Sequence, residues 1–163
     1  MTTDASADFW RFSQAFYALP GVAQACLILQ DRHGLDVNLT LYCCWYGLSG
    51  RGRIDAARLA AANAAIASWR HDVIEVLRAA RRALKEPAAV EPEAHAVRER
   101  VKAIELEAER ICQARLAALA PSSTVDDAAQ RRQDARVGLE TYLGSARVDS
   151  KPLFDALRTF VGW

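Results

Sequence analysis

Residues 26–48, CLILQDRHGLDVNLTLYCCWYGL, decide the fold, because two nearly unbroken apolar runs enclose a short polar segment, QDRHGLDVN at 30–38. Gly34 suits the left-handed conformation that ends many helices, and Asp36 is a preferred residue type for the N-cap of a new one. The stretch therefore predicts two helices joined as an αα-hairpin over about residues 20–48, at the centre of the protein.

The composition predicts an all-α protein. Alanine makes up about a fifth of the 163 residues, while valine, isoleucine and threonine are sparse, which favours helix over strand. Apolar spacing and capping residues predict helices over 8–19, 20–33, 36–48, 55–69, 70–85, 93–119, 124–144 and from 150 onward, with 55–69 and 70–85 as two helices or one bent helix. We expect Asp8 and Asp55 to be N-caps, and Thr124 with Asp127 to form a capping box. The chain is expected to be a single domain over 1–163, a compact bundle of seven or eight helices, with a potential subdomain break at 86–92.

The net charge and the spacing of the cysteines limit the kinds of protein this chain can be. The net charge of +1 gives no overall attraction for nucleic acid, which we do not expect as a partner. Pro20-Gly21 interrupts the uncharged segment 12–30, so we expect two buried helices and no membrane span. The first ten residues lack the basic and apolar regions of a secretory signal, and the four cysteines lack metal-site spacing. These features predict a cytoplasmic protein with reduced thiols.

The cysteines of the hairpin have two interpretations. In an antiparallel hairpin about Gly34-Leu35, Cys26 and Cys43 fall at facing positions, which would allow a thiol pair or a soft metal site with His33. Alternatively, they are small apolar residues of the core. His33 lies two turns from Cys26, too far to share one ion, so we favour packing for these cysteines and for Cys112. We predict no metal site and no cofactor.

The polar segment is the stronger candidate site, comprising Gln30, Asp31, His33, Asp36 and Asn38. A carboxylate in the last turn of a helix opposes the helix dipole, so Asp31 should have an arginine partner, for which Arg32, Arg51 and Arg53 are candidates. As chemistry, Asp31 and Asp36 would be a carboxylate pair for acid–base work or cation binding. As architecture, which we favour, they provide a cap and an ion pair that fix the hairpin. We assign no catalytic residue.

The helix predicted over 70–85 carries a basic stripe of Arg70, Arg78, Arg81, Arg82 and Lys85. At 100° per residue these side chains share one face, apart from the apolar arc. The stripe is either a contact for an anion or partner, or a solvated face neutralised by the acidic segment ELEAE at 105–109. Val97, Val101, Ile104, Ala108 and Ile111 form an apolar seam on the following long helix, which is either packed inside the bundle or a partner surface.

Three segments carry a family resemblance. LPGVAQACLILQDRHGLDVNLTLYCCWYGLSGRG at 19–52, WRHDVIEVLRAARRALK at 69–85 and RVKAIELEAERICQARL at 100–116 resemble an uncharacterised proteobacterial family, domain of unknown function 2390. The resemblance covers roughly residues 9–120. It implies a small cytosolic helical protein and brings no catalytic residue, cofactor or substrate.

Without a catalytic constellation, an enzyme is the less favoured class. We expect a cytosolic interaction or adaptor protein that binds another protein through a groove or the basic helix face. The alternative is a small-ligand binder or enzyme that uses Asp31, Asp36 and Asn38. A third hypothesis is nucleic-acid contact through the basic stripe.

Overall fold

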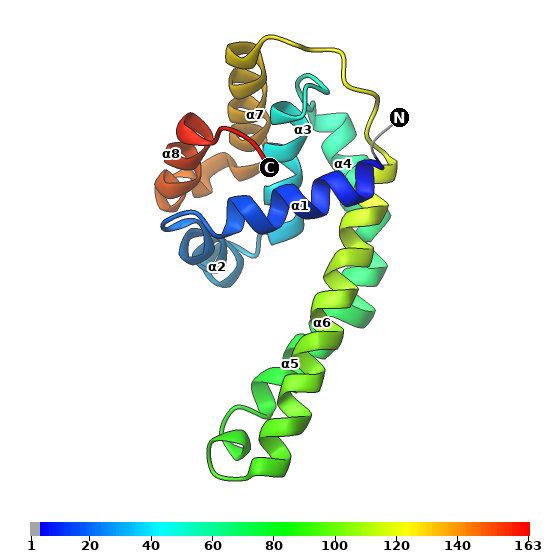
Figure 1. Ribbon diagram of the computed structural model, residues 1–163, viewed down its shortest axis with the longest axis vertical. Coiled ribbons are helices and arrows are strands. Elements are labelled where there is room, and N and C mark those ends of the chain that lie inside the picture. Colours follow the sequence, from blue (N-terminus) through cyan, green and yellow to red (C-terminus); the bar gives the residue numbers. More distant parts are fainter. Residues whose placement is uncertain (1–3) are drawn as a thin grey trace.

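The computed structural model describes residues 4–163. Residues 1–3, which belong to the predicted domain and to the N-terminal segment considered for a secretory signal, lie outside the described residues. Within that range the chain is helical and contains no strand (Figure 1). The α-helices are α1 Ala5–Tyr17, α2 Val22–His33, α3 Val37–Leu48, α4 Ala56–Trp69, α5 Glu75–Ala83, α6 Pro92–Ala118, α7 Ala128–Leu143 and α8 Lys151–Thr159. A π-helical turn, η1 Arg70–Ile74, joins α4 and α5 into one continuous helix, and two 3-10 turns follow, η2 Pro87–Ala89 and η3 Gly144–Asp149. The all-α fold class is confirmed.

An arm projects from the compact helical body (Figure 1). The arm comprises residues 75–104, which are α5, η2 and the N-terminal part of α6, and none of these residues is buried. The predicted break at 86–92 coincides with its tip, where the chain turns from α5 into α6. The buried residues of α6 begin at Glu105, where the helix enters the body. The assignment of the chain to one domain stays a prediction.

Helix α3 is the centre of the core, since every residue from Asn38 to Leu48 is buried. Phe9 of α1 stacks on Trp45 with ring centroids 4.8 Å apart. A turn at 34–36 links α2 to α3, yet α3 packs more extensively on α7 than on α2. Gly47 permits this approach, because a Cβ there would overlap the backbone of Ala135. The hairpin segment therefore needs a distant helix to complete its packing.

Capping explains where the helices around the turn begin and end. Asp36 accepts a hydrogen bond from the Leu39 N–H at 2.9 Å, and Gly34 has φ 64°, both as predicted. Two predicted caps are wrong. α1 begins at Ala5 behind Asp4, which leaves Asp8 in the first turn. Asp127 is itself the N-cap of α7, because its carboxylate accepts from the Gln130 N–H at 2.7 Å.

The four cysteines are free and buried. Burial raises the pKa of Cys26 to about 12 and also raises the pKa values of Cys43, Cys44 and Cys112. Neutral, enclosed thiols behave as small apolar side chains, in keeping with core packing.

No single helix within residues 4–163 is both long and apolar enough to cross a membrane. Helices α1 and α2 pass such a test only as a pair, and they are bent at 99° to each other.

Of the two interpretations of the apolar seam of α6, packing inside the bundle is observed only at Ala108, which is 4% exposed. Val97, Ile104 and Ile111 are 45%, 51% and 43% exposed. The buried face of α6 shares Ala108 with the seam, lies beside the exposed seam residues, and otherwise includes Glu105, Cys112 and Leu116. The residue types on this face are mixed, so apolar spacing alone identified only Ala108 of it.

Candidate functional site

The predicted polar site does not form one network. Asp31 is on the surface, where its carboxylate lies 3.5 Å from Arg82 of α5. The prediction that Asp31 pairs with Arg32, Arg51 or Arg53 is therefore wrong. Arg82 belongs to the arm and lies 51 positions from Asp31 in the chain, beyond any local pattern.

His33 is held apart from the other predicted site residues. Its Nε2 lies 2.8 Å from the Asp149 carboxylate of η3, and both side chains are 29% exposed. The pair ties the end of α2 to the segment before α8. Within residues 4–163 no cluster of three or more His, Cys, Asp or Glu side chains is arranged to hold a metal ion.

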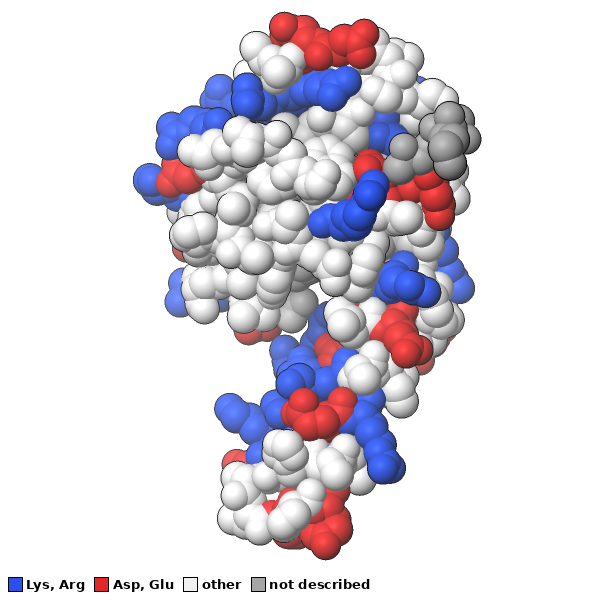
Figure 2. Space-filling view, in the orientation of Figure 1, with Lys and Arg blue, Asp and Glu red and all other residues white. Residues whose placement is uncertain are grey.

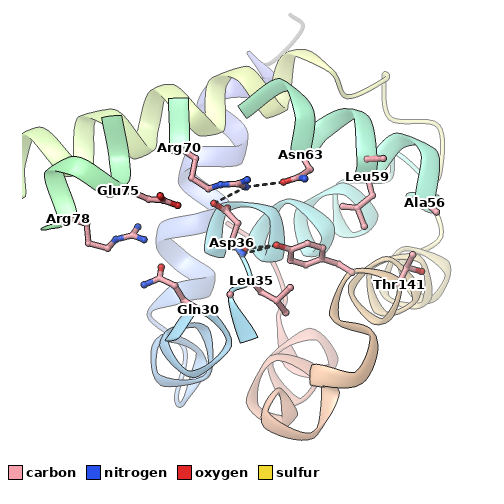
Figure 3. Close-up of a pocket in the computed structure, with 13 residues that line it drawn as sticks. Gln30, Leu35, Asp36, Ala56, Leu59, Asn63, Arg70, Glu75, Arg78 and Thr141 are labelled. Carbon is pink, nitrogen blue, oxygen red and sulfur yellow. Dashed lines mark hydrogen bonds and ion pairs between the residues drawn. The ribbon is translucent and has the colours of Figure 1, made fainter. Parts of the chain in front are cut away.

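Asp36 is a structural junction beside a cavity. Its backbone N–H donates to the Tyr142 hydroxyl of α7 at 2.7 Å, and Arg70 lies 3.7 Å from its carboxylate. Arg70 also donates to Asn63 of α4 at 2.9 Å. These contacts join α3, α4, η1 and α7 around the start of the central helix (Figure 3).

A cavity of about 640 Å³ opens beside this junction, and we call it the turn cavity. Figure 3 shows Gln30, Asp36, Asn63, Arg70, Glu75 and Arg78 around it. Two carboxylates and two guanidinium groups line it. The cavity is therefore electrically balanced, with Arg70 already held by Asp36 and Asn63.

Asn38 belongs to a second cavity, of about 320 Å³, between α1, α2, α3, α5 and α6. We call it the α1–α6 cavity. Gln30 and Arg78 line both cavities, so these two side chains form part of the wall between them. The apolar part of the α1–α6 cavity consists of Trp10, Tyr17, Leu27, Val37, Leu41 and Leu106.

A buried polar network closes the inner end of the α1–α6 cavity. Asn38 is 5% exposed; its amide nitrogen donates to Glu109, and its amide oxygen accepts from Gln113 Nε2 at 3.0 Å. Arg78 Nη2 donates to the other Glu109 oxygen at 2.9 Å. Asn38 is thus explained by a network with α6, which lies 71 and 75 positions away in the chain.

The basic stripe does not face solvent as a unit. Arg78 and Arg81 both donate to Glu105 of α6, and their side chains are only 19% and 27% exposed. Neutralisation by the segment 105–109 is therefore observed for these two residues. Arg70 turns towards Asp36 and Arg82 towards Asp31, while Lys85 is exposed near the arm tip.

Burial dominates the electrostatics of this network. It raises the pKa of Glu109, against the opposing effects of the Asn38 hydrogen bond and the Arg78 charge; nearby Asp36 and Glu105 raise it further. Burial likewise raises the pKa of Tyr17, which lines the same cavity. A carboxylate of raised pKa in an enclosed site holds a proton more readily than a surface glutamate.

Two buried polar atoms in the walls of the α1–α6 cavity have no hydrogen-bond partner within residues 4–163. They are Ser13 Oγ and Gln113 Oε1, on side chains 4% and 3% exposed. Buried hydroxyl and amide groups are normally paired, because an unmade hydrogen bond costs about 1–3 kcal/mol. Gln113 lines the cavity, so a rotation of its side chain would turn this unpaired acceptor towards the donor group of a bound molecule.

Sequence patterns missed Ser13, Tyr17 and Gln113, and they identified Glu105 and Glu109 only as part of the acidic segment that could neutralise the basic stripe. Glu105 and Glu109 are four positions apart and therefore share a helix face, which is a detectable signal. Their burial was not detectable, because it depends on α1 packing across α6.

Comparison with known proteins adds a family but no activity. Residues 8–116 match the model of a family described as a protein of unknown function (DUF2390). The matched range contains both cavities except for Thr141 and Tyr142 of α7. No curated protein and no solved structure matches the chain. Since the family model covers more than half of the residues, this chain belongs to the DUF2390 family.

Proposed function

We propose that this protein binds a small, uncharged polar molecule with a planar or apolar body in the α1–α6 cavity. The observation that carries the proposal is the unpaired Gln113 Oε1 in the wall of a cavity with an aromatic side. Its volume of about 320 Å³ lies at the lower end of the usual range for ligand pockets, roughly 300–1,000 Å³. This proposal extends the small-ligand alternative predicted for the polar segment, and of its residues Asn38 lines the cavity.

Charge balance favours a neutral ligand. Arg78 and Arg81 are paired with Glu105 and Glu109, and Arg82, the third arginine of the lining, lies 3.5 Å from the Asp31 carboxylate, so each cation in the wall already faces an anion. A charged ligand would compete with pairs that already satisfy one another. An uncharged amide or similar group would instead add hydrogen bonds without breaking them.

Three isosteric probes test this proposal: benzamide, benzamidine and benzoate are neutral, cationic and anionic forms of one shape. In an NMR titration, the readouts are the side-chain amide signals of Asn38 and Gln113 and the indole N–H signal of Trp10. We expect saturable shifts of these signals with benzamide and weaker binding of both charged probes. Tight binding of a charged probe with no response to benzamide would contradict the neutral-ligand proposal.

A second candidate function is protein–protein interaction through the exposed seam of α6, which supports the adaptor hypothesis. Val97, Ile104 and Ile111 recur every seven residues and are each more than 40% exposed. This spacing suits an apolar helix of another protein, packed as in a coiled coil. Co-purification of a defined partner should be lost in Ile104→Glu and retained in Val148→Glu, whose parent residue is 82% exposed elsewhere. Equal retention in both variants would exclude the seam.

We also propose a cytoplasmic location in a bacterial cell. The four buried free thiols support a reducing compartment, because cysteines of secreted proteins are usually paired. Fractionation of cells expressing the native protein tests this, and recovery outside the cytoplasm would contradict it.

A further inference from the structure

The groove between α7 and α8 is the strongest charged feature outside the two cavities described above. It has a volume of about 740 Å³ and is lined by Arg132, Arg136, Arg147 and Arg158. Figure 2 shows Lys and Arg side chains gathered, around a small acidic patch, over the end of the molecule where Figure 1 places α7 and α8.

The groove has an excess of positive charge. Four guanidinium groups line it against two carboxylates, those of Glu140 and Asp155. The net charge of the whole chain is only +1, so the groove carries more positive charge than the protein as a whole. An anionic ligand would therefore meet a local attraction that the overall charge does not predict.

The carboxylates orient the arginines without neutralising all of them. Glu140 lies 3.2 Å from Arg136 and 3.7 Å from Arg147, while Asp155 pairs with Arg158. Arg136 and Arg147 remain 58% and 56% exposed, which leaves their other N–H donors open to solvent. Arg132 has a buried Nε without a hydrogen-bond partner within residues 4–163.

The lining also offers an apolar surface. Phe154 and Leu157 of α8 line the groove beside the arginines, with Phe154 only partly buried. Arginine pairs well with phosphate oxygens because its planar fork matches their geometry. A ring beside the phosphate contacts provides a face on which a planar base can stack.

We propose that this groove binds a compact polyphosphate of the nucleoside-triphosphate class, with the arginines on the phosphates and Phe154 beside the base. Its size favours a small ligand over a polymer, since small-molecule clefts have volumes of roughly 300–1,000 Å³. All four arginines line this one groove. The site lies outside residues 8–116 and is independent of the α1–α6 cavity.

Calorimetric titration of the full chain at low salt tests the proposal, with ATP, inorganic tripolyphosphate and a short oligothymidylate as separate probes. The test variant is Arg136→Gln/Arg147→Gln. The control is Arg11→Gln/Arg58→Gln, which removes the same charge from side chains of equal exposure, 58% and 56%, that also lie beside carboxylates.

We expect ATP to bind, and its affinity to fall by roughly tenfold or more in the test variant and hardly at all in the control. Moderate salt should weaken binding in the native chain. Phe154→Leu should weaken ATP binding and leave tripolyphosphate binding unchanged, which separates base contact from phosphate contact.

Three results would overturn the proposal. One is the absence of ATP binding at low salt. Another is an equal loss of affinity in the test and control variants, which would indicate a general charge effect. The third is binding of the oligothymidylate without ATP binding, which would indicate a nucleic-acid surface.

Discussion

Gln113 of α6 donates through Nε2 to the Asn38 amide oxygen at 3.0 Å, joining two buried side chains 75 positions apart in the chain. The Asn38 amide nitrogen donates in turn to Glu109. The central helix α3 is thus locked to α6 by a polar contact inside an otherwise apolar region. This contact also fixes the inner wall of the proposed ligand site.

Asn38→Ala tests the energetic weight of that contact. The substitution leaves Glu109 and Gln113 buried with fewer partners, so we expect the free energy of unfolding to fall by about 2–4 kcal/mol. Urea denaturation measures the change. Asn63→Ala, which removes an exposed amide bonded to Arg70, is the control and should cost under about 1 kcal/mol. A similar small loss for Asn38→Ala would show that the network is not stabilising.

Glu109→Gln tests the pH dependence of stability. The folded pKa of Glu109 is raised, so the folded protein binds its proton more tightly than the unfolded chain does. Glu109 therefore contributes stability below its unfolded pKa, and this contribution is lost as the pH rises through the folded pKa.

Relative to Glu109→Gln, the native protein should lose free energy of unfolding as the pH rises from about 4 towards neutrality. Denaturation at several pH values measures the difference between the two proteins. A difference that stays constant, or that rises with pH, would contradict the raised pKa of Glu109.

Gly47 and Gly34 are required for different reasons: Gly47 leaves space for a neighbouring helix, and Gly34 adopts a left-handed backbone conformation. A Cβ on Gly47 would overlap the backbone of Ala135, so Gly47→Ala should cost more than about 3 kcal/mol, although alanine is the better helix former. Gly34 has φ 64° and open space around it, so Gly34→Ala should cost only about 1 kcal/mol from backbone strain. Thermal denaturation of the two variants measures which substitution costs more stability. Equal costs would mean that α3 and α7 are not in close contact.

The four thiols should be unreactive in the folded protein. They are buried, and the pKa of Cys26 is raised to about 12, so very little reactive thiolate exists at pH 8. A chromogenic disulfide reagent should detect almost no thiol before denaturation and all four after it. Rapid labelling of the native protein would contradict the core assignment.

Asp8 and Trp163 give a stability test at the chain ends. Asp8 accepts from the indole N–H groups of Trp45 at 2.9 Å and Trp163 at 2.8 Å. Trp163→Phe keeps a ring against Phe12 and Phe160 but removes a hydrogen bond, so we expect a loss of about 1 kcal/mol. Chemical denaturation measures it. No change would show that the contact contributes nothing.

The local parts of the fold could be predicted from the sequence. Gly34 and Asp36 end and begin helices through interactions within four residues. The sequence left 55–85 as two helices or one bent helix, and the structure joins α4 and α5 through the π-helical turn η1. The partners of Asp31 and Asn38 could not be predicted in this way, because Arg82, Glu109 and Gln113 reach them only through tertiary packing.

The apolar seam of α6 shows the same limit. Periodicity identified Val97, Ile104 and Ile111 as one face, yet the face that packs in the body includes Glu105 and Gln113. Burial of those polar residues is possible because Arg78 and Arg81 pair with Glu105 and because Asn38 accepts a hydrogen bond from Gln113. Apolar spacing does not detect a polar face that becomes buried through such pairing.

The most direct test of the proposed ligand site compares benzamide binding in Leu27→Trp and Leu119→Trp. Leu27 lines the α1–α6 cavity and is 43% exposed, while Leu119 is 49% exposed and does not line it. We predict that Leu27→Trp fills the cavity and abolishes the saturable shifts of the Asn38 and Gln113 amide signals. Leu119→Trp should leave them unchanged. Equal binding to both variants would contradict a ligand site in this cavity.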